Sequence, residues 1–360
     1  MRNGRGHSFA LWGIIVLFLL LGCASGGHRP LDQAYEMPVT PGAVLRMTTI
    51  APEIEKKIRA LDPESVSNDD VNEILAHAPA PRIFNIHGGI YPVHLAMESF
   101  SKFLIFMGYP EEKIQSPVNG TYSYSCYESS EKLAGLIAWY YEREGLRPMM
   151  IGHSQGGIQT VKVLHQLAGT FNGEIPVWNP VADRAEDRHA IIDPLTGKGR
   201  AVTDLHLSYA SAVSAGGITR FLPNQWEMMN RLRSIPDSVV EFTGFYMGMD
   251  VFGGDLLGFG PANRYSPNGK ALVRNVRLPA SYSHVIIPVT RHLAKSPDTR
   301  DWINRYVPSE DPELTEDLSS STTNILWAAD VWHSIKKHWV MELQNLIEAR
   351  DRWEQAKKSS

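Results

Sequence analysis

Short apolar runs alternate along this chain with longer stretches in which apolar residues recur every three or four positions. Residues 83–86 and 148–151 are short and mostly apolar runs, which predict buried strands of a parallel sheet. Residues 129–145 place apolar side chains on one helical face and end at Gly145, a pattern typical of an amphipathic helix with a glycine cap. Strands and helices that alternate in this way predict an α/β fold.

Residues 205–211, 238–246 and 271–279 predict three further strands. The chain between the strands at 148–151 and 238–246 is longer than the sheet needs, so 172–200 and 214–236, on either side of the strand at 205–211, are predicted to be insertions that could form a cap. Large apolar side chains there could line an acyl site or could simply pack the insertions onto the body. These residues are Trp178, Phe221, Leu222, Trp226, Met228 and Met229.

The C-terminal part has a composition of its own. Residues 307–324 are acidic and contain serine and proline, which predicts an exposed connector, and 325–358 follow with one long helical period. The apolar positions of this helix are Trp332, Ile335, Trp339, Leu343, Leu346 and Trp353. A helix of this kind can pack on the body of the fold, lie on a membrane or form a dimer.

One motif directly after the strand at 148–151 carries candidate chemistry. It consists of Gly152, His153, Ser154, Gln155, Gly156 and Gly157. A strand, this motif and a helix in that order are typical of a sharp turn that exposes a nucleophilic serine. Glycines flank the serine because a Cβ two positions away on either side would collide with neighbouring backbone.

A glycine-rich segment also follows the strand at 83–86. It consists of His87, Gly88 and Gly89. Acyl transfer passes through a tetrahedral intermediate whose oxyanion needs two preorganised backbone N–H donors. We predict that Gln155 and Gly89 supply them, with Gly88 and Ile90 as the nearby alternatives.

With these two motifs, residues 82–290 resemble the α/β-hydrolase superfamily, and within it the lipases and esterases that carry a His-Gly pair at the oxyanion loop. The resemblance implies a mostly parallel sheet flanked by helices. It also implies a catalytic triad whose members follow the order serine, acid, histidine along the chain.

That order leads to candidates for the other two members of the triad. Asp250 follows the strand at 238–246 and is the leading acid, while Asp255, after two glycines, is its rival. His284 follows the last predicted strand and is the candidate base. The alternatives for the base are His292, His333 and His338, which fall in helical segments well past the strand end.

The implied mechanism gives each residue a separate role. His284 accepts the proton of Ser154, and the carboxylate of Asp250 orients the imidazole and stabilises its cation. Water would release the acyl group in a carboxylic-ester hydrolase acting on a small-molecule or lipid ester. Acyltransferases and thioesterases use the same triad, and an envelope lipoprotein of this fold could also act without catalysis. No cofactor and no metal site are predicted.

The N-terminus resembles a bacterial lipoprotein signal. Arg2 and Arg5 precede an apolar run over 9–21 that is short for a membrane span, so a retained membrane helix is the less favoured alternative. Leu20, Leu21, Gly22 and Cys23 match a lipoprotein cleavage box. Lipidation of Cys23 would anchor the protein to a membrane of the bacterial envelope, and Ala24 favours the outer membrane.

Charge and cysteine content restrict the remaining functions. The formal net charge is −4, and loss of two arginines with the signal would leave −6, which argues against nucleic-acid binding. With Cys23 lipidated, Cys126 has no intramolecular disulfide partner and is predicted to be a buried thiol.

These patterns predict four parts of the chain. They are a signal peptide (1–22), a lipidated tether (23–45), a hydrolase domain (46–306) and a connector with a helix (307–360).

Overall fold

The computed structural model describes residues 40–216, 223–248, 250, 252–253 and 263–359. Several sequence predictions therefore concern residues outside the described ones. These are the signal peptide with Cys23, the rival acid Asp255, and Phe221 and Leu222 of the second insertion.

A six-stranded sheet with the order β12-β10-β8-β3-β1-β2 forms the centre of the fold, and every neighbouring pair of strands is parallel. Its strands are β1 (Ile83–His87), β2 (Tyr124–Ser125), β3 (Met149–His153), β8 (Leu207–Val213), β10 (Val239–Met247) and β12 (Leu272–Leu278). The predicted α/β class with a mostly parallel sheet is thus confirmed. The short strand β2 was not predicted, because two residues give no periodic signal.

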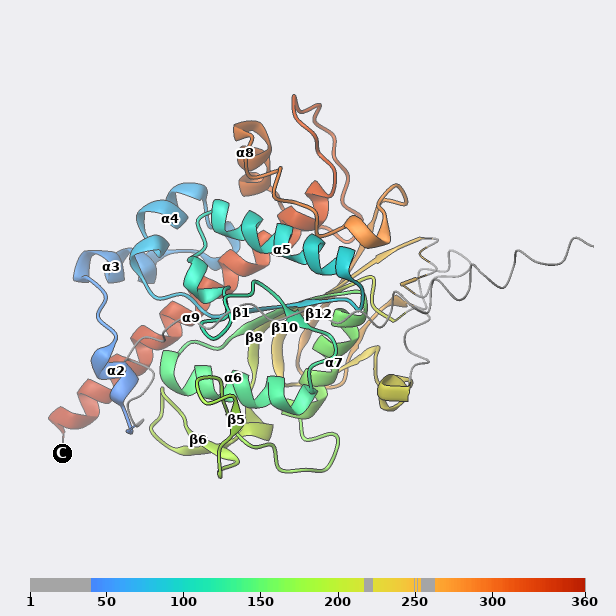
Figure 1. Cartoon of the computed structure of the whole chain (residues 1–360). Coiled ribbons are helices and arrows are strands. Elements are labelled where there is room, and N and C mark those ends of the chain that lie inside the picture. Colours follow the sequence, from blue (N-terminus) through green and yellow to red (C-terminus); the bar gives the residue numbers. More distant parts are fainter. Residues whose placement is uncertain (1–39, 217–222, 249, 251, 254–262, 360) are drawn as a thin grey trace, which may run out of the picture.

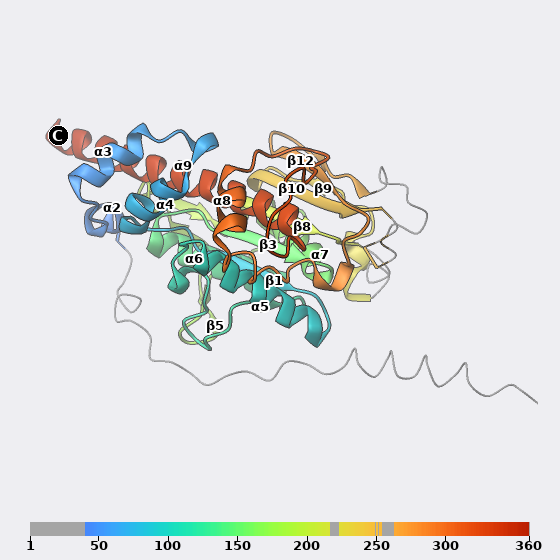
Figure 2. The ribbon, with the colours of Figure 1, turned by 90° about the horizontal axis from the view of Figure 1, so that it is seen from above.

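Helices cover both faces of this sheet (Figures 1 and 2). One face carries α6 (Ser130–Glu144) and α7 (Gln155–Leu167), and the other carries α5 (Tyr91–Phe106) and α9 (Ile325–Lys358). Because strand side chains alternate, Phe84 and Met150 pack with α6 and α7, whereas Ile83 and Ile151 pack towards α5 and α9. The two hydrophobic layers hold the carboxyl ends of the strands in a fixed array.

The predicted amphipathic helix at 129–145 is α6. Its N-cap is Ser129, whose hydroxyl accepts a hydrogen bond from the backbone of Lys132, and it ends at Gly145 with φ 74°. A side chain is strained at that φ, which explains the glycine. Figure 1 places α6 beside α7 below the sheet.

The C-terminal helix α9 is a structural layer of the fold. The interpretation in which it packs on the body of the fold is confirmed, because Trp327, Trp332 and Trp339 are fully buried in the hydrophobic layer on this face of the sheet. The indole of Trp339 donates a hydrogen bond to the carbonyl of Pro79 at 2.8 Å. A face buried in this way is not available to lie on a membrane or to form a dimer.

Short helices from the N-terminal part pack against α9. They are α2 (Ala43–Met47), α3 (Pro52–Ala60) and the 3₁₀ turn η2 (Pro63–Ser65), which α4 (Asn68–Glu73) follows, while α8 (Pro297–Arg305) precedes the connector. The predicted boundary of the tether at 45 is wrong by a few residues, because Val44 and Leu45 are already buried in this layer. None of the described helices is both long and apolar enough to cross a bilayer.

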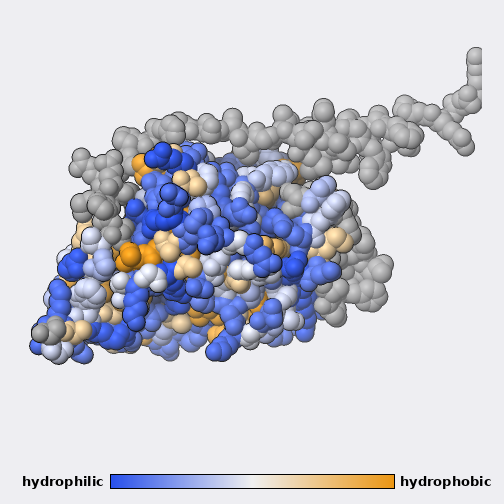
Figure 3. Space-filling model, turned by 90° about the horizontal axis from the view of Figure 1, so that it is seen from below, coloured by the Kyte–Doolittle hydropathy of each residue, from blue (hydrophilic) through white to orange (hydrophobic). Residues whose placement is uncertain are grey.

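The first insertion is not a cap over the site. It forms two antiparallel hairpins, β4 (Trp178–Asn179) with β5 (Arg184–Ala185) and β6 (Ala190–Ile192) with β7 (Gly199–Ala201). Both hairpins pack on the outer side of α6, where the buried carboxylate of Glu142 accepts hydrogen bonds from Arg188 and from the backbone of Ile192, each at 2.7 Å. The face of the molecule that they help to form is mostly hydrophilic (Figure 3).

The second insertion runs beside α7. Its described part contains η7 (Pro223–Met228) and β9 (Ser234–Ile235), and Glu227 forms an ion pair with Lys162 of α7. Met228 is fully buried and packs this segment onto the body, whereas Trp226 is 60% exposed. An acyl-binding role for Trp226 and Met229 stays a prediction.

Candidate active site

Ser154 lies in the sharp turn between β3 and α7, with φ 56° and ψ −124°. L-residues rarely adopt this conformation, so the surrounding structure must impose it. The glycines allow the close approach, because a Cβ on Gly152 would lie 2.4 Å from the carbonyl oxygen of Gly156, and a Cβ on Gly156 would lie 2.2 Å from that of Ile86. A Cβ on Gly157 would lie 2.7 Å from the Cβ of Ala215, which follows β8.

Three predicted residues meet at this turn. The Nε2 atom of His284 lies 2.9 Å from Ser154 Oγ, and its Nδ1 atom lies 3.0 Å from each carboxylate oxygen of Asp250. Because an ionised carboxylate only accepts hydrogen bonds, Nδ1 carries the proton and the lone pair of Nε2 accepts from the serine hydroxyl. This is the tautomer that a general base needs.

The strands explain why these residues converge. Asp250 follows β10, and His284 opens the short 3₁₀ turn η9 (His284–Ile286) after β12, so both lie at the same edge of the sheet as Ser154. Burial would raise the pKa of Asp250, but the hydrogen bond and charge of His284 and the N–H of Gly253 outweigh it and hold that pKa below its usual value. Asp250 is therefore ionised at neutral pH.

The alternative histidines lie elsewhere. His333 donates a hydrogen bond to the carbonyl of Glu64 at 3.2 Å, and His338 contacts the carboxylate of Glu241 at 3.3 Å, so both belong to the packing of α9. His292 lies in the turns between η9 and α8, where burial lowers its pKa. The structure thus brings His284 to Ser154 and places the other three histidines away from it.

The predicted oxyanion loop lies against the nucleophile. A Cβ on Gly88 would lie 3.0 Å from the Cβ of Ser154. Burial lowers the pKa of His87 to about 4, and the neutral ring donates from Nδ1 to the carbonyl of Gly88 at 2.8 Å, which fixes the peptide that carries the N–H of Gly89. The first N–H groups of a helix have no partner within it, so Gln155 at the start of α7 presents a free donor.

Some contacts of this site were not predicted. His153 donates from Nε2 to the backbone carbonyl of His284 at 2.7 Å, the ring of Phe252 lies 5.6 Å from the His284 ring, and the hydroxyl of Tyr127 donates to the carbonyl of Gly89 at 3.1 Å. His153 was noted only as a member of the serine motif. Tyr127 and Phe252 carry no signal in the sequence, because their roles depend on contacts between distant segments.

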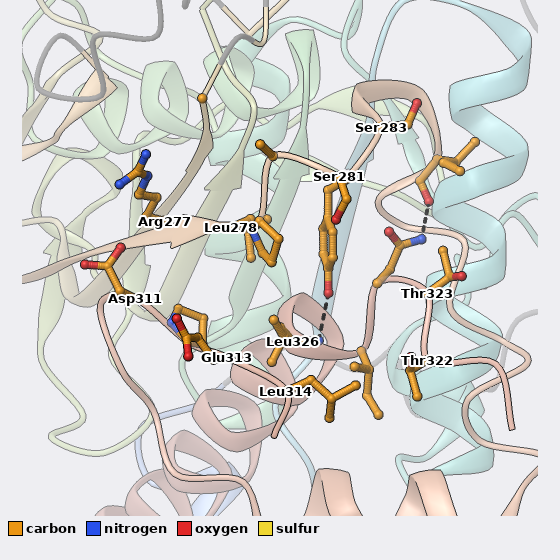
Figure 4. Close-up of a pocket in the computed structure, with 18 residues that line it drawn as sticks. Arg277, Leu278, Ser281, Ser283, Asp311, Glu313, Leu314, Thr322, Thr323 and Leu326 are labelled. Atoms are coloured by element: carbon orange, nitrogen blue, oxygen red, sulfur yellow. Dashed lines mark hydrogen bonds between the residues drawn. The ribbon is translucent and has the colours of Figure 1, made fainter. Parts of the chain in front are cut away.

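A cavity of about 760 Å³ lies beside the segment that carries His284 (Figure 4). It is lined by residues 277–283, by the connector and by the start of α9, and neither Ser154 nor His284 contributes to its wall. Two hydrogen bonds cross from this segment to the start of α9. Tyr282 Oη accepts from the backbone of Leu326 at 3.1 Å, and Asn324 Nδ2 donates to the carbonyl of Ile286 at 2.7 Å.

Comparison of the whole chain with models of known protein families, with curated proteins and with solved structures gives no match. In the described part of the chain, no group of three or more His, Cys, Asp or Glu side chains could hold a metal ion. The function is therefore inferred from the geometry around Ser154.

Proposed function

We propose that this protein is a serine hydrolase that cleaves carboxylic esters through an acyl-enzyme. The observation that carries the proposal is the hydrogen bond of 2.9 Å between Ser154 Oγ and His284 Nε2, in a turn that holds Ser154 in a strained conformation. A serine hydroxyl is a poor nucleophile until a neutral imidazole accepts its proton. Asp250 fixes the tautomer in which this can happen.

Each step of the reaction assigns one task to these residues. Ser154 Oγ attacks the ester carbonyl while its proton moves to His284 Nε2, and the oxyanion accepts hydrogen bonds from the N–H groups of Gln155 and Gly89. The imidazolium, stabilised by Asp250, then returns the proton to the leaving alcohol. Water attacks the acyl-enzyme with His284 again as the base, and the acid leaves with Ser154 regenerated.

The order of the elements supports an α/β-hydrolase fold for the chain. Ser154 follows β3, Asp250 follows β10 and His284 follows β12. That order of serine, acid and histidine is the one implied by the resemblance of the two motifs. An acyltransferase or a thioesterase would use the same residues and differ only in the acceptor or in the bond that is cleaved.

The test is covalent labelling with a fluorophosphonate probe followed by peptide mapping. Labelling of Ser154 in the wild type, with no labelling and no hydrolysis of a short-chain chromogenic ester in Ser154→Ala, supports the proposal. The residual rate of His284→Ala should match that of the double variant, because residues that act as one unit are not additive. Turnover retained in Ser154→Ala would refute the triad and favour a different function for the fold.

We also propose that Cys23 is lipidated and anchors the protein to the bacterial envelope, a proposal supported by the sequence alone. The Cys23→Ser variant should then have one of two fates. It is either cleaved and released from the membrane, or it stays uncleaved and keeps its signal segment. Mass spectrometry of the mature N-terminus checks this. An unmodified N-terminal residue other than Cys23 would reject the anchor.

A further inference from the structure

His153 connects the nucleophile strand to the turn that carries the base. It is the last residue of β3, its side chain is fully buried, and its Nε2 atom lies 2.7 Å from the backbone carbonyl oxygen of His284. A carbonyl only accepts hydrogen bonds, so Nε2 carries the proton and donates it. The residue directly before the nucleophile therefore holds the main chain of the base.

This donor is fixed, because the ring stays neutral. Burial, and after it the charge that His284 carries when protonated, lowers the pKa of His153 to about 3. The Nδ1 atom of His153 is also buried and meets no hydrogen-bond partner among the described residues. A neutral ring with its one proton committed to a carbonyl cannot serve as an acid, a base or a counter-ion for the reaction.

The turn that carries His284 needs such support. The turn η9 has only three residues, and short 3₁₀ turns have poor hydrogen-bond geometry of their own. On its outer flank, Asn324 donates to the carbonyls of Ile286 and Val289, at 2.7 and 3.2 Å, and so ties the turn to α9. The contact from His153 comes from the other side, from the strand that also carries the nucleophile.

We propose that His153 is a positioning residue for His284. Its Nε2–H donates a hydrogen bond to the His284 carbonyl, and this bond sets the distance between His284 Nε2 and Ser154 Oγ. Because His153 ends the strand that leads directly into Ser154, its position relative to the nucleophile is fixed. Displacement of a reacting group by about 1 Å can lower a rate by about 100-fold. The effect of His153 on catalysis rests on the proposed function, whereas its hold on the His284 turn does not.

Two substitutions of similar length separate the hydrogen bond from the packing. His153→Gln keeps an N–H donor near the position of Nε2, and His153→Met fills the same space without a donor. His165 supplies the matched control, because it is a buried histidine of α7 whose Nε2 lies 2.9 Å from the carbonyl oxygen of Ser234, away from the site.

We expect His153→Met to lower kcat by about 10-fold to 100-fold with KM changed by less than about 2-fold. His153→Gln should recover most of kcat, and His165→Met should shift the urea midpoint without lowering kcat. Unchanged kcat in His153→Met, an equal loss in His153→Gln, or an equal loss in His165→Met would overturn the proposal. If His153→Met does not fold, His153→Asn, whose amide is too short to reach the carbonyl, takes its place.

A second readout does not depend on turnover. The proton on His284 Nδ1 is shared with Asp250 and should give a far-downfield ¹H resonance in the wild type. That resonance should shift or broaden in His153→Met and return in His153→Gln, and an unchanged resonance in His153→Met would refute the hold on the turn. If the wild type neither labels at Ser154 nor hydrolyses esters, the proposed function fails, and this resonance still decides the role of His153.

Discussion

The strain at Ser154 predicts that removal of the nucleophile's side chain can stabilise the protein. With φ 56° and ψ −124°, Ser154 occupies a region of backbone conformation that costs an L-residue about 1 to 3 kcal/mol. Ser154→Gly abolishes that cost, whereas Ser154→Ala keeps the Cβ and therefore keeps the strain. Both variants lose the same hydrogen bond to His284, so their difference isolates the backbone contribution.

The expected difference follows from two opposing contributions. Relief of strain favours the glycine variant by about 1 to 3 kcal/mol. The greater freedom of glycine in the unfolded chain favours the alanine variant by about 0.4 to 1 kcal/mol. Ser154→Gly should therefore match or exceed Ser154→Ala in unfolding free energy, by up to about 2.6 kcal/mol, and both should be inactive.

Urea unfolding followed by circular dichroism measures this difference. Ser309, an exposed residue of the connector whose φ is not positive, is the control position. There the glycine variant should be less stable than the alanine variant by about 0.4 to 1 kcal/mol. If the alanine variant at Ser154 exceeds the glycine variant in stability by as much as it does at the control position, the turn stores no strain.

Three further predictions concern the same region. Asp250→Asn should lower kcat by about 10⁴-fold in ester hydrolysis, because the amide favours the wrong imidazole tautomer, and a mild effect would move the acid elsewhere. Gly156→Ala should cost about 3 kcal/mol of unfolding free energy, because its Cβ would meet the main chain of β1, whereas Gly173→Ala, with open space around it, should cost less than about 0.5 kcal/mol in the same urea assay. From pH 7 to pH 5 the wild type should lose about 2 kcal/mol through His153 alone, because a pKa of about 3 in the fold, against an ordinary 6.5, makes the unfolded chain bind the extra proton. Over the same pH range, His153→Gln should lose about 2 kcal/mol less unfolding free energy than the wild type. Equal losses in the two proteins would contradict a neutral, buried His153.

The main layers of this fold follow from local patterns, but the roles of some elements do not. Strands buried on both faces are largely apolar, so short and mostly apolar runs identified β1, β3, β8 and β10. The helix α9 was also visible in its tryptophan spacing. The sequence does not show that α9 packs directly on the sheet. That position depends on α5, which leaves part of the same face of the sheet uncovered, and nothing in the sequence of α9 indicates this. The hairpins at 172–200 were assigned to a cap on length alone, and length does not reveal that Glu142 and Arg188 hold them on α6.

The convergence of Ser154, Asp250 and His284 could be predicted, because each follows a strand and the carboxyl ends of parallel strands meet at one edge of a sheet. The contact between His153 and His284 could not, since it joins a side chain to a main-chain atom 131 residues away. Spacing within a motif says nothing about such a contact.

The strained turn explains why three consecutive residues can serve one site. His153 and Gln155 are buried while Ser154 between them is partly exposed, so the sharp change of backbone direction turns the serine outward and keeps its neighbours in contact with the fold. In the proposed mechanism, His153 fixes the base through its hydrogen bond to His284, Ser154 supplies the nucleophile and the N–H of Gln155 donates to the developing oxyanion. A relaxed turn would separate these three tasks. The stability gained by Ser154→Gly would therefore measure what the fold gives up to keep them together.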